Sequence, residues 1–214
     1  MRKFYSLAFV FIIGCASPAQ YKCGPTDHCS GNPTEFVQSA IDVIVIHNFP
    51  EEKGQYKAVM WMDGDIMNAW VTNDKNVNIS TSLYKNLKDK QILAVIAHEL
   101  AHLKLGHYYQ KMGVSILATA GQVALSALNP LAGYIPVDQV ATAAFSRSKE
   151  TEADIEAVKY LIKSGYSKQD FLSLLHWMRY NSSGRRDPFF ASHPHIEDRI
   201  ESVIHSPELA AFKF

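Results

Sequence analysis

The sequence predicts an α+β fold, with a small early β-sheet followed by a mostly helical remainder. Strand-like runs rich in β-branched and aromatic residues lie between residues 56 and 80. The segments before and after them carry apolar residues at helical spacing, so α+β fits the order of elements best. The length of 214 residues, with 47% hydrophobic and 20% charged residues, suits one globular domain.

The overall charge and the cysteine count exclude several classes of protein. Lysine plus arginine total 21 and aspartate plus glutamate total 21, so the net charge is zero and no nucleic-acid partner is expected. The composition also argues against a disordered chain, a collagen-like fibre and a polytopic membrane protein. Three cysteines are too few for a disulfide scaffold.

Residues 1–14 have the layout of a secretory signal peptide. Two basic residues precede the apolar run Phe4–Ile13, which is too short to cross a bilayer of about 30 Å as a helix. The run ends at Ile12–Cys15, which resembles a bacterial lipobox and implies cleavage before a lipidated Cys15. No aspartate follows the cysteine, which by the same resemblance favours the outer membrane, facing the periplasm. The alternative is an ordinary signal with a chance cysteine at its end.

Residues 15–33 are rich in proline, glycine and small polar residues, and we expect a flexible tether ahead of a domain at residues 34–214. Cys23 and Cys29 lie within this tether. Outside the cytoplasm two nearby cysteines can form a disulfide, and idle thiols are the alternative. Neither cysteine is expected to be catalytic.

The first elements of the domain follow from local patterns. Apolar spacing predicts an amphipathic helix from Thr34 to His47, with Thr34 as a candidate N-cap. Two strands are expected over Tyr56–Met62 and Ala69–Thr72. Alternating polarity over Val77–Ser80 predicts an edge strand.

Four helices are expected after the strands. The first runs from about Asp89 to about His107, and the second from about Asp138 to Lys163, with Gly165 as its stop signal. A capping box at Ser167 opens the third, which continues through Met178, and Pro194 in a first turn opens the last. The charge-free segment 112–137 is expected to be a buried hairpin, with contact to a membrane or a partner as the alternative.

A metal site is predicted inside the first of these helices. His98 and His102 are four residues apart, so both project from one helix face and can bind one zinc ion. Glu99 can reach a zinc-bound water as a general base, which makes the HExxH pattern typical of metalloproteases. The alternative is a helix with two surface histidines.

A catalytic zinc site needs a third protein ligand. Glu150 can supply it from a later helix, while Asp154, one turn on, can accept a hydrogen bond from a ligand histidine. Helical geometry directs Glu152 elsewhere, and it is expected to direct His107 to another face, although a structural contact stays open. A solvated acidic helix face is the competing interpretation.

Together these motifs resemble the HtpX and CAAX-prenyl-protease family of gluzincin metallopeptidases. The HExxH element is followed by SRxxExxAD at residues 146–154 and by HPxxxxRI at residues 193–200, and Asn68-Ala69-Trp70 also matches. The resemblance covers about residues 60–205 and is closest to the lipid-tethered periplasmic branch, because strong transmembrane helices are absent from the pattern. It implies a zincin-type domain with one zinc ion per chain.

The resemblance also implies the role of each site residue. His98, His102 and Glu150 would be the zinc ligands, Glu99 the catalytic base and Asp154 the partner of a ligand histidine. His193 would either stabilise the oxyanion or cap the zinc, and Arg199 would assist the site or form a structural salt bridge.

The expected function is zinc-dependent endopeptidase activity on unfolded or misassembled cell-envelope proteins, that is, protein quality control. The substrate is expected to lie extended along Val77–Ser80 and to pair with the sheet. The alternative is a lipid-anchored periplasmic chaperone or assembly factor whose zinc site rarely cleaves. Cleavage preference and oligomeric state do not follow from the sequence.

Overall fold

The computed structural model describes residues 32–62, 64–107, 137–182 and 187–212. The predicted signal, most of the tether with Cys15, Cys23 and Cys29, and residues 112–136 of the charge-free segment lie outside these ranges. Within them, no helix is both long and apolar enough to cross a membrane.

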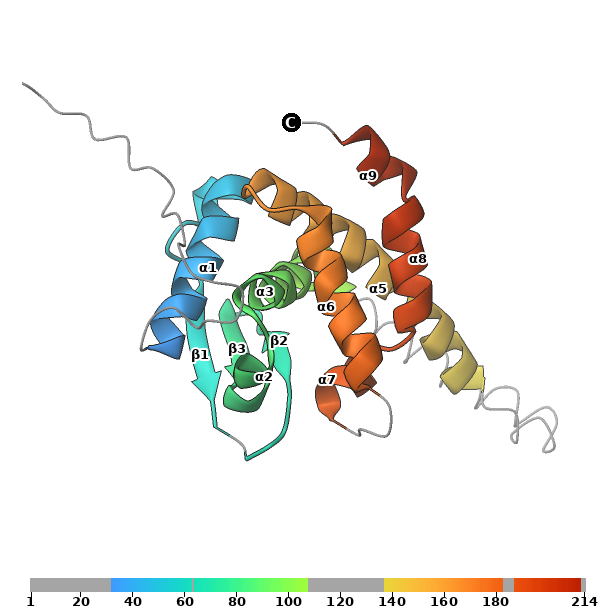
Figure 1. The fold of residues 1–214 in the computed structure, drawn as a ribbon, viewed down its shortest axis with the longest axis horizontal. Coiled ribbons are helices and arrows are strands. Elements are labelled where there is room, and N and C mark those ends of the chain that lie inside the picture. Colours follow the sequence, from blue (N-terminus) through green and yellow to red (C-terminus); the bar gives the residue numbers. More distant parts are fainter. Residues whose placement is uncertain (1–31, 63, 108–136, 183–186, 213–214) are drawn as a thin grey trace, which may run out of the picture.

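The fold is mostly helical with one small sheet, as the α+β prediction required (Figure 1). The sheet and its surroundings comprise α1 (Pro33–Asn48), the 3₁₀ turn η1 (Pro50–Glu52), β1 (Lys57–Trp61), β2 (Ala69–Val71), β3 (Asn76–Ser80) and α2 (Thr81–Asn86). The helical part comprises α3 (Asp89–Lys104), α5 (Val137–Lys163), α6 (Lys168–Asn181), α7 (Pro188–Ser192), α8 (Ile196–His205) and α9 (Pro207–Ala211).

The sheet has the strand order β1-β3-β2, so β3 is the central strand. It pairs in parallel with β1 and antiparallel with β2. The prediction of an edge strand at Val77–Ser80 is therefore wrong, and residues 77–80 are all buried. The alternating polarity comes from Asn78 and Ser80, which are buried polar residues rather than a solvated face.

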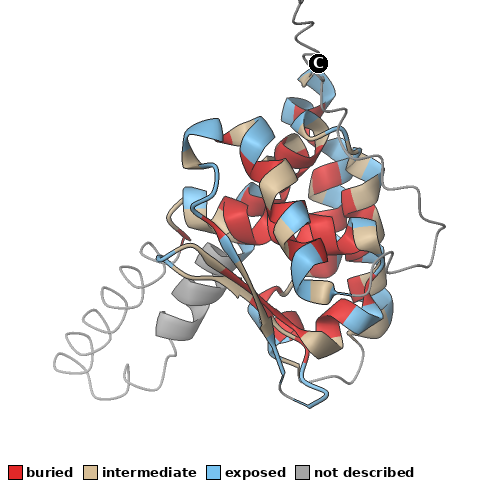
Figure 2. Cartoon of the chain, turned by 90° about the vertical axis from the view of Figure 1, so that its left-hand side faces the viewer, coloured by how far each residue is buried: buried red, intermediate tan, exposed pale blue. Residues whose placement is uncertain are grey.

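Helix α3 runs through the centre of the molecule. It packs against β2 on one side and against α5 and α6 on the other. Every residue from Gln91 to Ala101 is buried, and Figure 2 shows the same concentration of buried residues in the interior. A helix segment that is buried on every face is stable only inside a protein, which agrees with the central place of α3.

Helix ends follow local chemistry, with two corrections. The side chain of Asn32, not that of Thr34, caps α1, because Pro33 is tolerated in the first turn and the helix starts before Thr34. The capping box at Ser167 is present at the start of α6, and Gly165 adopts φ +84° after α5. Pro194 does not lie in a first turn, because α8 begins at Ile196.

Candidate metal centre

Three separate elements bring four potential ligands together. His98 and His102 come from α3, Glu150 comes from α5, and His193 directly follows α7. One donor atom from each of these side chains lies within 4.8 Å of the others. His98, Glu150 and His193 are buried and His102 is half-buried, so the site is largely shielded from water.

The distances between the donor atoms fit one tetrahedral zinc ion. Nε2 of His98 lies 3.0 Å from Nε2 of His102 and 3.2 Å from Nδ1 of His193. Oε1 of Glu150 lies 3.2 Å from Nε2 of His102, and Oε2 lies 3.0 Å from Nδ1 of His193. Ligands about 2.0–2.1 Å from a tetrahedral zinc lie about 3.3 Å from one another, so the four side chains match such an ion.

The hydrogen-bond partners of His98 and His102 also fit a metal ion between these two side chains. Nδ1 of His98 lies 2.9 Å from Oδ1 of Asp154, so this nitrogen carries the proton. Nδ1 of His102 lies 2.9 Å from Nδ1 of His107, and one of these two atoms must donate. If His102 is the donor, the Nε2 lone pairs of His98 and His102 face each other, and a cation between them would remove that repulsion.

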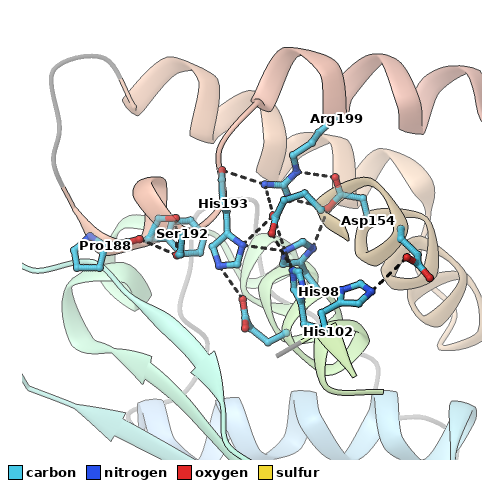
Figure 3. A network of polar contacts seen from close by, with 12 residues as sticks. His98, His102, Asp154, Pro188, Ser192, His193 and Arg199 are labelled. Atoms are coloured by element: carbon cyan, nitrogen blue, oxygen red, sulfur yellow. Dashed lines mark hydrogen bonds and ion pairs between the residues drawn. The ribbon is translucent and has the colours of Figure 1, made fainter. Parts of the chain in front are cut away.

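Asp154 and Arg199 lie behind the ligands (Figure 3). Nε and Nη2 of Arg199 each lie 2.7 Å from one oxygen of Asp154, and Nη1 lies 3.1 Å from Oε2 of Glu150. Burial favours a neutral Asp154, but the charge of Arg199 and the hydrogen bonds from His98 and Arg199 together outweigh burial and lower the pKa of that carboxyl. Asp154 can therefore accept a hydrogen bond from His98 as an anion, and Arg199 neutralises the added charge.

Glu99 lies beside the ligands rather than among them. Oε1 of Glu99 is 3.2 Å from Nε2 of His193, and the residue is 6% exposed. Burial favours its neutral form, but the charge and hydrogen bond of His193, together with the charges of His98 and His102, outweigh burial and lower the pKa of Glu99. A carboxylate that is ionised inside a largely buried site is suited to accept a proton.

His193 fills the remaining position of the site. Burial opposes its charge, but Glu150 and Glu99 outweigh burial and raise the pKa of His193 to about 10. Its Nδ1 belongs to the four-donor cluster and its Nε2 lies 3.2 Å from Oε1 of Glu99, so the side chain lies between the other potential ligands and Glu99. Both roles that the sequence leaves open, a cap on the metal and an oxyanion donor, fit this position.

His107 does not face another side of the helix, contrary to prediction. α3 ends at Lys104, and Gly106 adopts φ +67°, which turns the chain back over the end of the helix. His107 is 4% exposed and contacts His102. Glu152 does point away from the metal ligands, but Oε2 lies 3.5 Å from Nε2 of His107. Gly106 was the signal in the sequence that the helical register would not continue.

A cavity of about 520 Å³ opens onto the site. Residues 68–73, which include all of β2, line one side of it. Glu99, His102, Glu150 and His193 line the other side. A molecule in this cavity would contact the metal ligands and the edge of the sheet at once.

Comparisons with known proteins match the same part of the chain. Residues 34–206 match Peptidase family M48. The chain is 32% identical over 161 residues to metalloprotease YcaL of Escherichia coli (strain K12) and 25% identical over 170 residues to metalloprotease LoiP of the same organism. It is 30% identical over 129 residues to a putative beta-barrel assembly-enhancing protease of Vibrio cholerae.

Each alignment covers a larger share of this chain than of the relative. They span 69%, 73% and 52% of this chain, in the order given. They span 62%, 66% and 26% of the relatives, so this chain corresponds to less than two thirds of each of them.

Proposed function

The chain belongs to peptidase family M48, and from this premise we propose that it is a zinc-dependent metalloendopeptidase. The observation that carries the proposal is the convergence of His98, His102 and Glu150 beside an ionised Glu99. Structural zinc sites are usually closed by cysteine-rich sets of four ligands, whereas a catalytic site combines three ligands with a nearby base. The donor set here is of the second kind once His193 is regarded as displaceable.

The side chains divide the reaction between them. A zinc ion held by His98, His102 and Glu150 would supply a Lewis acid that polarises the substrate carbonyl and acidifies a water. Glu99 takes a proton from that water as the new C–O bond forms. It then passes the proton to the leaving nitrogen as the C–N bond breaks, so the base is regenerated.

We assign His193 the role of a cap in the resting enzyme. Its Nδ1 is close enough to Glu150 and His98 to complete the ligand set, which leaves no room for the attacking water. Substrate binding would have to displace this side chain. In the alternative role, His193 would stay beside Glu99 and donate a hydrogen bond to a developing oxyanion.

The substrate is proposed to pair with β2 instead of β3. Both sides of β3 are already occupied by β1 and β2, which removes the pairing expected from the sequence. Among the described strands β2 pairs with β3 alone, and its residues line the cavity. Asn68 and Thr72 bond to β3, so by alternation Val71 directs its N–H and C=O to the other side.

Pairing through the backbone supports a substrate class. Such pairing requires an extended substrate segment, and its main-chain hydrogen bonds depend little on the substrate sequence. It therefore favours unfolded or misassembled proteins over folded ones. The name of the Vibrio cholerae relative refers to β-barrel assembly, which is consistent with substrates from the cell envelope. Lipidation at Cys15 and the tether up to residue 33 are proposed to hold the domain at the outer membrane, facing the periplasm.

A chaperone or assembly factor that holds zinc without cutting is the second candidate. The position of His193 among the four donors favours it, because a capped site binds metal but admits no water. In that case the cavity beside β2 would bind extended segments and release them intact.

The experiment that separates the two candidates uses unfolded casein and an unfolded outer-membrane protein. Each is incubated with the zinc-loaded wild-type chain and with zinc-loaded Glu99→Gln, and new N-termini are identified by mass spectrometry. We expect fragments with the wild type and none with the variant. Intact substrate in both samples, together with suppressed aggregation, would favour the chaperone.

A further inference from the structure

His107 stands in the same relation to His102 as Asp154 does to His98. Nδ1 of His107 lies 2.9 Å from Nδ1 of His102, and Oδ1 of Asp154 lies 2.9 Å from Nδ1 of His98. The rings of His102 and His107 are 5.0 Å apart at an interplanar angle of 76°, so one ring presents its edge to the other. Each helix histidine of the site thus has its own partner on the side away from the donor cluster.

The direction of the hydrogen bond follows from the use of Nε2 by His102. A histidine that offers its Nε2 lone pair to a metal is protonated at Nδ1, so His102 donates and Nδ1 of His107 accepts. The proton of His107 is then on Nε2, which faces Oε2 of Glu152 at 3.5 Å. Glu152 in turn lies 2.6 Å from Nζ of Lys149.

These contacts connect the segment that follows α3 to α5. His107 reaches its place because the chain reverses at Gly106, whose N–H bonds to the carbonyl of Leu103. The side chain is 4% exposed, although it lies beyond the end of the regular helix. His107 also lines the cavity, and its Nδ1 contacts Nδ1 of His102, so its position involves more than packing.

We propose that His107 is a positioning residue that holds His102 in the tautomer and ring orientation needed for zinc, with the Glu152 carboxylate at ion-pair distance from Nε2 of His107. The inference rests on the proposed zinc site but not on peptidase activity. Partners of this kind typically alter metal affinity when they are removed, because the ligand ring is no longer held toward the metal. A residue that only packs against the helix end would not have this effect.

The first test compares His107→Asn with His107→Leu in the full chain. Asparagine keeps an oxygen that can accept the proton of His102, whereas leucine has similar size and no acceptor. Zinc affinity is measured by competition with a chromogenic chelator. We expect His107→Leu to weaken zinc binding roughly 10- to 100-fold and His107→Asn to recover most of the loss.

Several outcomes of this test overturn the inference. Wild-type affinity in both variants, or an equal loss in both, would show that the acceptor does not matter. If wild type and His107→Leu bind zinc equally, this inference alone fails. If the wild type binds no zinc, the proposed function fails with it.

The main result of the second test comes from the wild type and does not depend on a variant that could misfold. Nitrogen-15 spectra of the histidine rings in the zinc-loaded wild type report which nitrogen carries each proton. We expect a proton on Nδ1 of His102, none on Nδ1 of His107 and one on Nε2 of His107. A proton on Nδ1 of His107 would overturn the inference. Glu152→Gln should shift the Nε2 resonance of His107, whereas Glu156→Gln on the same helix should not.

Discussion

Arg199 on α8 holds Asp154 on α5 through two parallel hydrogen bonds, each 2.7 Å long. Both side chains are at most 1% exposed, so the pair is fully removed from water. Asp154 also contacts His98, and Arg199 also contacts Glu150, so this pair connects α8 to two of the potential metal ligands. The two roles that the sequence leaves open for Arg199, assisting the site and forming a structural salt bridge, are therefore compatible in this geometry.

The first prediction concerns the stability supplied by this pair. Arg199→Ala leaves the Asp154 carboxylate buried without its arginine partner, so the free energy of unfolding of the zinc-free chain should fall by about 3–5 kcal/mol. Urea unfolding followed by circular dichroism measures it. Arg147→Ala is the matched control. Arg147 on α5 forms an ion pair with Asp198 on α8, and both side chains are exposed. The loss in free energy of unfolding should therefore stay below about 1 kcal/mol. Equal losses in the two variants would contradict the account.

The second prediction tests the edge of β2. Val71→Pro removes one N–H from the side of β2 that does not pair with β3, a change that an edge strand tolerates. Loss of one substrate hydrogen bond of about 0.5–1.5 kcal/mol should lower kcat/KM for casein about twofold to tenfold. Val71→Ala, which keeps the N–H, should cleave at nearly the wild-type rate. If both variants cleave like the wild type, the substrate does not pair at Val71.

The third prediction concerns the cap. His193→Ala removes one of the four donors and opens the site to water, so zinc should transfer faster to a chelator and casein cleavage should rise. His205→Ala, an exposed histidine on α8, is the control and should change neither rate. A fall in cleavage with zinc retained would instead assign His193 to the oxyanion.

The fourth prediction is a pH dependence of stability. Hydrogen bonds from Lys104 and Tyr56 lower the pKa of Glu52 from 4.5 to about 2. Because the folded-state pKa is the lower one, the stabilisation is complete above the unfolded pKa of 4.5 and is lost as the pH falls toward 2. The difference in Tm between wild type and Glu52→Gln should therefore be largest near neutral pH and shrink in acid. A difference that is constant with pH would contradict the ion-pair explanation.

The sequence was most informative where a pattern is local. The apolar residues of α3 and the spacing of His98, Glu99 and His102 predicted both the central helix and its chemistry, because helical periodicity alone places those side chains. The spacing of Glu150 and Asp154 worked in the same way on α5. The capping box at Ser167 likewise depends on four consecutive residues.

Errors arose where the outcome depends on tertiary structure. The polarity of Val77–Ser80 could not distinguish an edge strand from a central one, because Asn78 and Ser80 are buried by other parts of the fold. Helical spacing directs His107 to another face only if the helix continues to residue 107. Instead α3 ends at Lys104 and the chain turns at Gly106. The place of His193 depends on α7, a short helix that no periodic pattern predicts.

The most direct test of the central claim is the zinc affinity of Glu150→Ala beside that of Glu156→Ala. Both residues lie on α5, but Glu150 alone reaches the donor cluster, while Glu156 contacts Lys159. We predict that Glu156→Ala keeps wild-type affinity and casein cleavage. Glu150→Ala should lose cleavage and lose more affinity than the roughly 10- to 100-fold that removal of an outer hydrogen-bonding partner costs. Full zinc binding and full cleavage by Glu150→Ala would contradict the proposed site.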